Sequence, residues 1–301
     1  MLLAEVLSSL QPLAGASVVD CTLGFGGHAA ALLAHAGPDG QLVGFDLDEG
    51  NLANVRERLD AVGNLYSLHH ANFAAIEGVL AVESAGGADA LLADLGMSSI
   101  QVDDADRGFS YMRDGPLDMR MDRTRGKTAA ELLATLPADE LAAAFRELGD
   151  EPQADAIAAA VVESRTVAPL ERTTQLRDLI QLAAPVKVEF AVGKKNPSAW
   201  QQRAKPAARV FQALRILVNR ELASLTHLLR VLPRCLKPGG RAAIISFHSG
   251  EDRLVKAAFK EGHQKGVYSQ VSDEPIRASS DERYSNPRSR SAKMRVAVRA
   301  S

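Results

Sequence analysis

The chain has 301 residues, of which 46% are hydrophobic and 24% are charged. This composition supports a large folded core and excludes a wholly disordered protein. The net charge of −2 hides an asymmetry, because residues 1–199 hold 15 basic and 29 acidic side chains, whereas residues 200–301 hold 20 and 8. The basic last third favours a polyanionic partner, and a solvated basic surface is the alternative.

Several features of the chain bear on its compartment. The first thirteen residues contain Glu5 but no lysine or arginine, and their leucines recur at helical spacing. They predict an amphipathic helix rather than a secretory signal. No apolar run approaches the ~20 residues of a membrane span. Cys21 and Cys235 lack metal-site spacing and predict two buried thiols. Together these features predict a cytoplasmic protein.

Strand-like and helical segments alternate through the first hundred residues. This alternation is typical of an α/β protein with a parallel sheet. The expected strands are 17–20, 41–46, 65–69 and 88–93, and the expected helices between the first three are 27–35 and 50–61.

Residues 103–205 show helical patterns and no strand. We interpret them as an inserted all-helical subdomain for substrate recognition, with helices near 128–133, 138–148, 153–165 and 173–182. The α/β pattern then returns, so that residues 1–102 plus 206–301 form the predicted cofactor-binding domain. Its second part contains one long amphipathic helix over 207–232, a Pro-Gly-Gly turn, a strand at 241–247, a helix at 251–260, a polar loop and a last strand at 292–298.

A glycine-rich loop, DCTLGFGGH, follows the first predicted strand. Gly26 and Gly27 permit a tight turn and a close approach of a ligand to the backbone. Asp46 lies twenty residues after Gly26, at the end of the second predicted strand, where a carboxylate accepts hydrogen bonds from both ribose hydroxyls of an adenosine. The loop and Asp46 indicate a nucleotide-like cofactor, and ordinary turn residues are the alternative.

NAD and S-adenosylmethionine are the two main cofactors that such a loop binds. Asp20 opens the loop, and its carboxylate would repel a pyrophosphate but attract the amino group of a methionine moiety. The sequence therefore predicts S-adenosylmethionine.

A charged and flexible stretch, DLGMSSIQVDDADRGFSYMRDGPLDMRMD, begins at Asp94. We expect Asp94 at the carboxyl end of its strand, where open α/β sheets bind ligands. Asp118 and Asp122 are spaced to share a divalent ion, but a third ligand is not evident and no metal is predicted.

Five segments resemble, in the same order, the bacterial 16S ribosomal RNA cytosine-N4 methyltransferases of the MraW or RsmH type. They are GFGGH, the stretch from Asp94, KPAARVFQALRILVNREL, ISFHSGEDRLVK and NPRSRSAKMR. The resemblance extends from residue 1 to about residue 299. It implies a class I, Rossmann-like methyltransferase sheet with a helical insertion, acting in ribosome biogenesis on one cytosine of the decoding region in the small subunit.

The resemblance also implies the residues that contact the cofactor. They are Gly26, Gly27, His28, Asp46, Phe73, Asp94 and Gln101. The chain departs from the family pattern at Ile100, Lys205, Ala208 and Gly250, among other positions, and none of the departures is at a cofactor position.

Methylation of the cytosine amine requires an acceptor that holds the amine or takes its proton, because the nitrogen lone pair is conjugated into the ring. The candidates are Asp94, Ser98, Ser99 and His248. A structural role is the alternative for His248.

A target base inside folded RNA must be extruded, which requires a basic cleft. The arginines that we expect to contact the RNA are Arg107, Arg120, Arg209, Arg215 and Arg253. Surface ion pairs are the alternative for these side chains. A non-catalytic ribosome-assembly factor and an NAD-dependent oxidoreductase are the competing functions, and the sequence leaves monomer and homodimer open.

Overall fold

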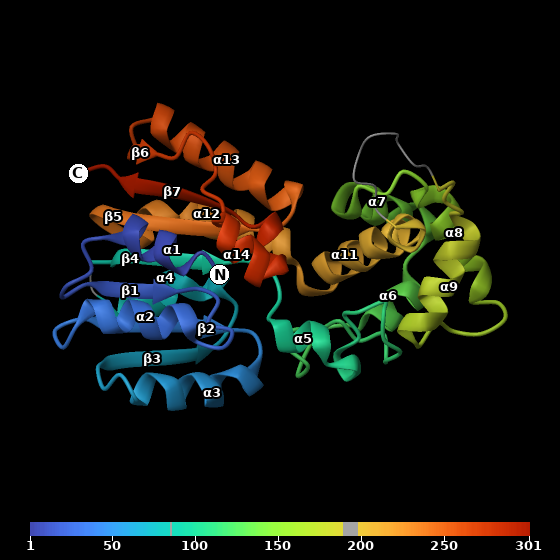
Figure 1. The fold of residues 1–301 in the computed structure, drawn as a ribbon, viewed down its shortest axis with the longest axis horizontal. Coiled ribbons are helices and arrows are strands. Elements are labelled where there is room, and N and C mark those ends of the chain that lie inside the picture. The colour runs from blue at the N-terminus through green and yellow to red at the C-terminus, as the bar shows by residue number, and fades with distance from the viewer. Residues whose placement is uncertain (85, 189–197) are drawn as a thin grey trace. The chain divides into compact units, whose positions relative to one another are not determined.

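The computed structural model describes residues 1–84, 86–188 and 198–301, and only the backbone of residues 99 and 100. It divides into two compact units (Figure 1). Unit 1 comprises residues 1–97 and 222–301, and unit 2 comprises residues 98–221. The predicted boundaries at 102/103 and 205/206 differ from these. Helix α11 (Lys205–Asn219) accounts for the second difference, because it packs against helix α7 (Ala138–Gly149) of unit 2.

Unit 1 contains a seven-stranded sheet. In spatial order its strands are β3 (Leu65–His70), β2 (Gln41–Asp46), β1 (Ser17–Asp20), β4 (Ala88–Asp94), β5 (Leu236–Ser246), β7 (Lys293–Arg299) and β6 (Tyr268–Val271). The first five strands are parallel, as predicted, but β7 pairs antiparallel with β5, and β6 pairs antiparallel with β7. Chain order reverses between β1 and β4, a topological switch point at which α/β sheets bind ligands.

Helices cover both faces of this sheet and create two cores. Adjacent residues of β1 face opposite ways, so that Val18 packs into one core and Val19 into the other. One core contains side chains of α4 (Ile76–Glu83), α12 (Glu221–Cys235) and α13 (Ser249–Gln264). The other contains side chains of α1 (Leu3–Leu10), α2 (Gly27–Ala36) and α3 (Glu49–Asp60). Burial on both faces explains why the central strands are almost continuously apolar.

Unit 2 is built from helices. Besides α7 and α11 they are α5 (Ser99–Asp103), α6 (Ala129–Thr135), α8 (Ala154–Ser164), α9 (Thr173–Ala183) and α10 (Ala199–Arg203). The four helices predicted between residues 128 and 182 are confirmed. The single long helix predicted over 207–232 is wrong, because Arg220 adopts a left-handed conformation, with φ of 52°, and separates α11 from α12. Among the described residues, no helix is long and apolar enough to span a membrane.

Candidate functional site

Three carboxylates end three neighbouring strands of unit 1. Asp20, Asp46 and Asp94 are the last residues of β1, β2 and β4. Because these strands are parallel, the three side chains lie at the same edge of the sheet, beside the switch point. The predicted position of Asp94 at a strand end is confirmed.

Asp46 fixes the glycine-rich loop. Its Oδ2 accepts a hydrogen bond of 2.7 Å from the backbone N–H of Gly24, and its Oδ1 accepts one of 2.7 Å from that of Asp48. Gly24 and Gly26 have φ of 50° and 71°, a left-handed conformation that glycine adopts without strain. Gly26 precedes α2, and Gly27 is the first residue of that helix. Asp46 thus supports the loop in addition to any contact with a ribose.

Thr22 connects the ends of β1 and β4. Its Oγ1 accepts a hydrogen bond of 2.7 Å from the backbone N–H of Asp94, and its own N–H donates one of 3.0 Å to Asp20 Oδ1. The sequence analysis missed Thr22, and its only signal was a position two residues after a strand end. The residue holds both carboxylates in fixed positions.

Two carboxylate oxygens at this edge have no partner. Among the described residues, Asp20 Oδ2 and Asp94 Oδ1 are buried and accept no hydrogen bond. Burial raises the pKa of Asp20 and that of Asp94 to about 7. A buried acceptor without a donor is costly, on the order of 1–3 kcal/mol, so both atoms suit a ligand that presents cationic or N–H donors. The α-ammonium of a methionine moiety is such a donor, and the site therefore fits S-adenosylmethionine.

His28 lies next to Asp94. Its Nε2 is 2.7 Å from the carbonyl oxygen of Met1, and its Nδ1 is 3.5 Å from Asp94 Oδ2. Burial lowers the pKa of His28 to about 4, so the ring is neutral at pH 7. Because a carbonyl only accepts, the ring proton belongs on Nε2, and Nδ1 presents its lone pair to Asp94. A protonated Asp94 carboxyl can donate to that lone pair.

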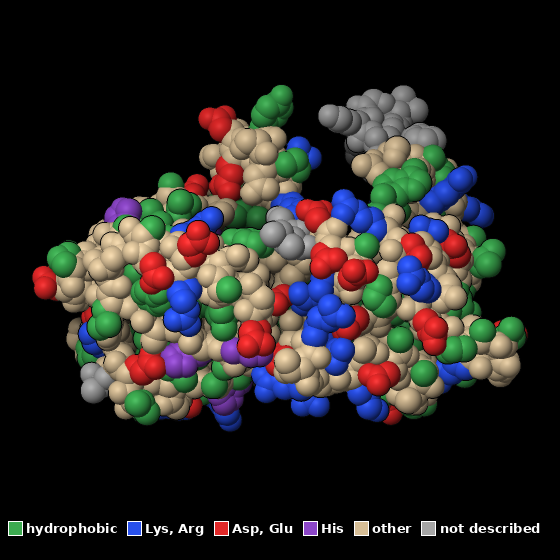
Figure 2. All heavy atoms as spheres, turned by 90° about the horizontal axis from the view of Figure 1, so that it is seen from below, with side chains coloured by type: hydrophobic (Ala, Val, Ile, Leu, Met, Phe, Trp, Pro, Cys, Tyr) green, Lys and Arg blue, Asp and Glu red, His purple; other side chains and the backbone are tan. Residues whose placement is uncertain are grey.

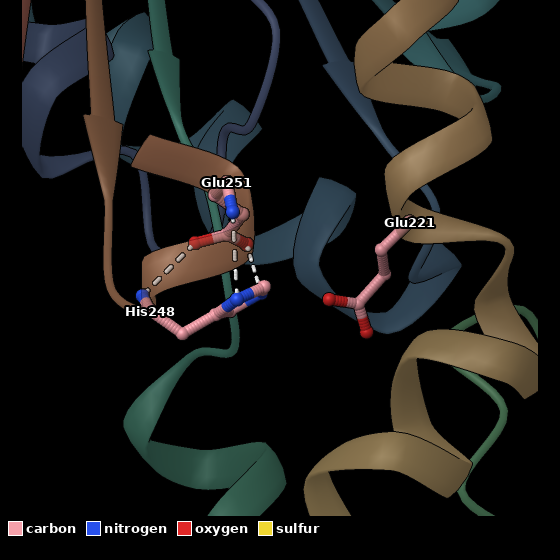
Figure 3. Close-up of side chains that lie close together, drawn as sticks. All are labelled: Glu221, His248 and Glu251. Carbon is pink, nitrogen blue, oxygen red and sulfur yellow. Dashed lines mark hydrogen bonds and ion pairs between the residues drawn. The ribbon is translucent and has the colours of Figure 1, made fainter. Parts of the chain in front are cut away.

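Two further candidates lie on unit 1. Phe73 begins a 3₁₀ turn, η1 (Phe73–Ala75), and packs half-buried against the core. His248 caps α13, and Figure 3 shows its ring facing Glu251, with 3.2 Å between His248 Nε2 and Glu251 Oε1. Glu251 in turn accepts the backbone N–H of Phe247 at 2.8 Å. These contacts agree with the structural alternative for His248, and its contact with the amine stays a prediction.

Three further candidates lie at the start of α5 in unit 2. Ser98 Oγ accepts the backbone N–H of Gln101 at 3.3 Å, and Gln101 Oε1 accepts that of Ser98 at 3.1 Å. This reciprocal pair is a capping arrangement. The side chain of Ser99 lies outside the described residues.

Most of the arginines expected to bind RNA have partners within unit 2. Arg107 donates to the carbonyl oxygens of Arg120 and Met121, at 3.0 Å each. The other pairs, by their shortest distances, are Arg120 with Asp118 at 2.7 Å, Arg215 with Glu221 at 2.9 Å, and Arg209 with Glu151 at 3.5 Å. On the face in Figure 2, basic side chains lie among acidic ones. Arg120, Arg209 and Arg215 thus form ion pairs, the alternative for them, whereas Arg107 binds carbonyl oxygens and Arg253 on α13 of unit 1 is exposed. RNA binding by these arginines stays a prediction.

Asp118 and Asp122, whose spacing would allow a shared divalent ion, also have partners within unit 2. Asp118 binds Arg120 through both oxygens, at 2.7 and 3.0 Å. Asp122 accepts hydrogen bonds from Thr124 and from Arg125. Each carboxylate is therefore neutralised by an arginine rather than directed at a shared ion.

Comparisons with known proteins identify the family of this chain. The model of the MraW methylase family matches residues 1–300. The chain is 44% identical to the ribosomal RNA small subunit methyltransferase H of Citrifermentans bemidjiense, covering 97% of this chain and 95% of that protein. It is 42% identical to the protein of the same name from Geobacter sulfurreducens, covering 98% and 96%. For that of Symbiobacterium thermophilum the identity is 41%, covering 99% and 95%.

Proposed function

The chain belongs to the MraW methylase family, and from this premise we propose that it methylates the exocyclic N4 amine of a cytosine in the decoding region of 16S ribosomal RNA. It is an S-adenosylmethionine-dependent methyltransferase. The observation that carries the proposal is the pair of unpartnered carboxylate oxygens, on Asp20 and Asp94, beside the glycine-rich loop. Asp20 supplies the charge that a methionine ammonium requires, and Asp94 supplies an acceptor for N–H donors.

Residues of unit 1 would hold the cofactor. Asp20 would bind the amino group, and the backbone of Gly26 and Gly27 would line the loop, with His28 beside them. Asp46 would accept from the ribose hydroxyls while it supports Gly24. Phe73 and Asp94 would flank the adenine. When bound, the cofactor supplies an electrophilic methyl group.

Asp94 is the strongest candidate for the proton acceptor. Its Oδ1 accepts no hydrogen bond within the described structure, and burial raises its pKa to about 7, close to the optimum for a general base at neutral pH. Ser98 and His248 are weaker candidates, because both act as helix caps. Asp94→Asn should reduce methyl transfer at least a hundredfold and change cofactor affinity only a few-fold, by calorimetry. Equal losses in the two measurements would assign Asp94 to cofactor binding alone.

The partner we propose is 16S ribosomal RNA within the small subunit, in the bacterial cytoplasm, and unit 2 would recognise it. Tritium transfer from labelled S-adenosylmethionine to unmodified 30S subunits, followed by mass spectrometry of the product nucleoside, tests the function. N4-methylcytidine is the expected product. A methyl group on another atom or base would reject the assignment.

The two competing functions have less support. Membership of a methylase family does not favour an NAD-dependent oxidoreductase, and Asp20 at the loop opposes a pyrophosphate. A non-catalytic assembly factor would bind S-adenosylmethionine and 30S subunits without methyl transfer, which the same tritium experiment detects.

A further inference from the structure

The segment before the last strand lies at the same sheet edge as the cofactor residues. Strand β7 runs antiparallel to β5, and its first residue, Lys293, pairs with Ser246 at the end of β5. The preceding segment consists of α14 (Ser280–Ser285) and the 3₁₀ turn η3 (Pro287–Ser291). It therefore lies at the carboxyl edge of the parallel strands.

Contacts within unit 1 connect α14 directly to the site. The carboxylate of Glu282 accepts the backbone N–H of Leu2, at 3.0 and 3.2 Å. The carbonyl oxygen of the neighbouring Met1 accepts a hydrogen bond from His28 Nε2, and His28 Nδ1 is 3.5 Å from Asp94. Figure 1 shows α14 beside the N-terminus. Three contacts, through the first two residues and His28, thus connect the segment with Asp94.

The backbone of this segment is firmly anchored. Ala278, Ser289 and Ala292 are at most 3% exposed, so short side chains attach the segment to unit 1. Ser279 caps α14 by accepting the N–H of Glu282 at 3.1 Å, and Ile276 forms a β-bridge with Met294. The outward side chains are therefore not required to hold the segment in place.

The exposed side chains of this segment include one tyrosine and two arginines. Tyr284 is 88% exposed. Arg283 and Arg290 are exposed, and their Nε–H groups donate to the carbonyl oxygens of Ser279 and of Arg283. In the described ranges neither guanidinium forms an ion pair, in contrast to Arg120 and Arg215 of unit 2. The nearest acids in sequence are Asp281 and Glu282, and Glu282 binds Leu2.

We propose that α14 and η3 form an RNA-docking surface for single-stranded nucleotides next to the target base. Tyr284 stacks on a base, and Arg283 and Arg290 bind backbone phosphates. Exposed aromatic rings between arginines are typical of sites that bind unpaired RNA, because every base presents a flat face and every linkage a charge. The inference rests on the proposed function, since an extruded cytosine leaves its neighbours unpaired.

Binding of a labelled decoding-region fragment of 16S ribosomal RNA, measured by fluorescence anisotropy over a range of salt, tests the surface. Tyr284→Ala should weaken binding about tenfold, whereas Tyr284→Phe, which keeps the stacking face, should bind like the unmodified protein. Arg283→Ala with Arg290→Ala should lower the slope of log affinity against log salt by roughly 1 to 2. Arg56→Ala on α3 is the matched control, because Arg56 is exposed and α3 follows β2, which is separated from β7 by three strands of the sheet.

The outcomes separate this surface from the enzyme's function. Calorimetry with S-adenosylhomocysteine should give unchanged affinity in all variants, which excludes misfolding of the cofactor site. If the variants bind the RNA fragment and 30S subunits like the unmodified protein while methyl transfer to 30S is intact, the docking surface is rejected and the function stands. If the variants lose affinity only for 30S subunits, the surface contacts ribosomal protein and the RNA proposal is overturned. Absence of methyl transfer by the unmodified protein would reject the function instead.

Discussion

The backbone N–H of Asp94 donates a hydrogen bond of 2.7 Å to the hydroxyl oxygen of Thr22. This bond joins the loop after β1 to the end of β4, on the two sides of the topological switch point. Thr22 also donates its N–H to Asp20, so one small residue contacts both aspartates, each of which keeps one oxygen that accepts no hydrogen bond among the described residues. Loss of its hydroxyl should disturb cofactor binding more than the fold.

Thr22→Val should lower cofactor affinity about tenfold. The substitution keeps the side-chain shape but leaves the Asp94 N–H without an acceptor, a loss on the order of 1–3 kcal/mol. Thr22→Ser retains the hydroxyl and should bind within a few-fold of the unmodified protein. Calorimetric titration with S-adenosylhomocysteine measures both. Equal affinity in the valine and serine variants would contradict a positioning role for the hydroxyl.

Asp46→Ala should reduce cofactor affinity more than tenfold and leave RNA affinity unchanged. Both carboxylate oxygens accept backbone N–H groups, from Gly24 and Asp48, so the alanine variant loses the support of the loop as well as a ribose contact. Asp46→Asn retains one acceptor oxygen and should give an intermediate affinity. Calorimetric titration measures cofactor affinity, and fluorescence anisotropy measures RNA affinity. Unchanged cofactor affinity in the alanine variant would show that Asp46 does not contribute to the cofactor site.

The local pattern of the sequence predicts the parallel part of the fold well. Strand β4 ends at Asp94 as expected, because buried parallel strands are continuously apolar and their first polar residue marks the edge. The break at Arg220 was missed, since the amphipathic pattern continues through it while the backbone turns left-handed. Strand β6 was missed because it is a short edge strand with exposed Ser269 and Gln270.

The partners of the candidate site residues were harder to predict. Ion pairs such as that of Arg209 with Glu151 join residues far apart in the sequence, and no local pattern encodes them. The same holds for the hydrogen bond between Thr22 and Asp94. Sequence motifs therefore identify the loop and strand ends, whereas the tertiary structure decides which polar atoms remain available to a ligand.

Arg120→Ala should destabilise the chain by about 2 kcal/mol, because it leaves the Asp118 carboxylate, only 7% exposed, without its bidentate partner. Arg123, 3.6 Å from Asp118, replaces this partner only in part. Asp118→Asn combined with Arg120→Ala should recover part of the loss, since asparagine carries no charge that requires a partner. Urea unfolding of the single and double variants measures the coupling. Additive losses would indicate that the pair contributes no coupling energy.

Cofactor binding should release protons at pH 6 and not at pH 8.5. In the free protein burial raises the pKa of Asp20 and Asp94 to about 7, so both are largely protonated at pH 6. A bound ammonium favours the carboxylate form and lowers the pKa of Asp20, so up to about one proton leaves this carboxyl on binding. At pH 8.5 both groups are already ionised and release none.

Titration of S-adenosylhomocysteine in two buffers with different ionisation enthalpies counts these protons, because the difference in apparent binding enthalpy is proportional to the number released. Asp20→Asn removes one titrating group and should lower the number of protons released at pH 6 by close to one. The affinity of this variant for S-adenosylhomocysteine should also lose the pH dependence that the carboxylate confers. The same titration with Glu57→Gln, an exposed residue of α3, controls for a general change in charge. An unchanged proton count in Asp20→Asn would show that the ammonium is bound elsewhere, and the site would then require another anchor for the methionine moiety.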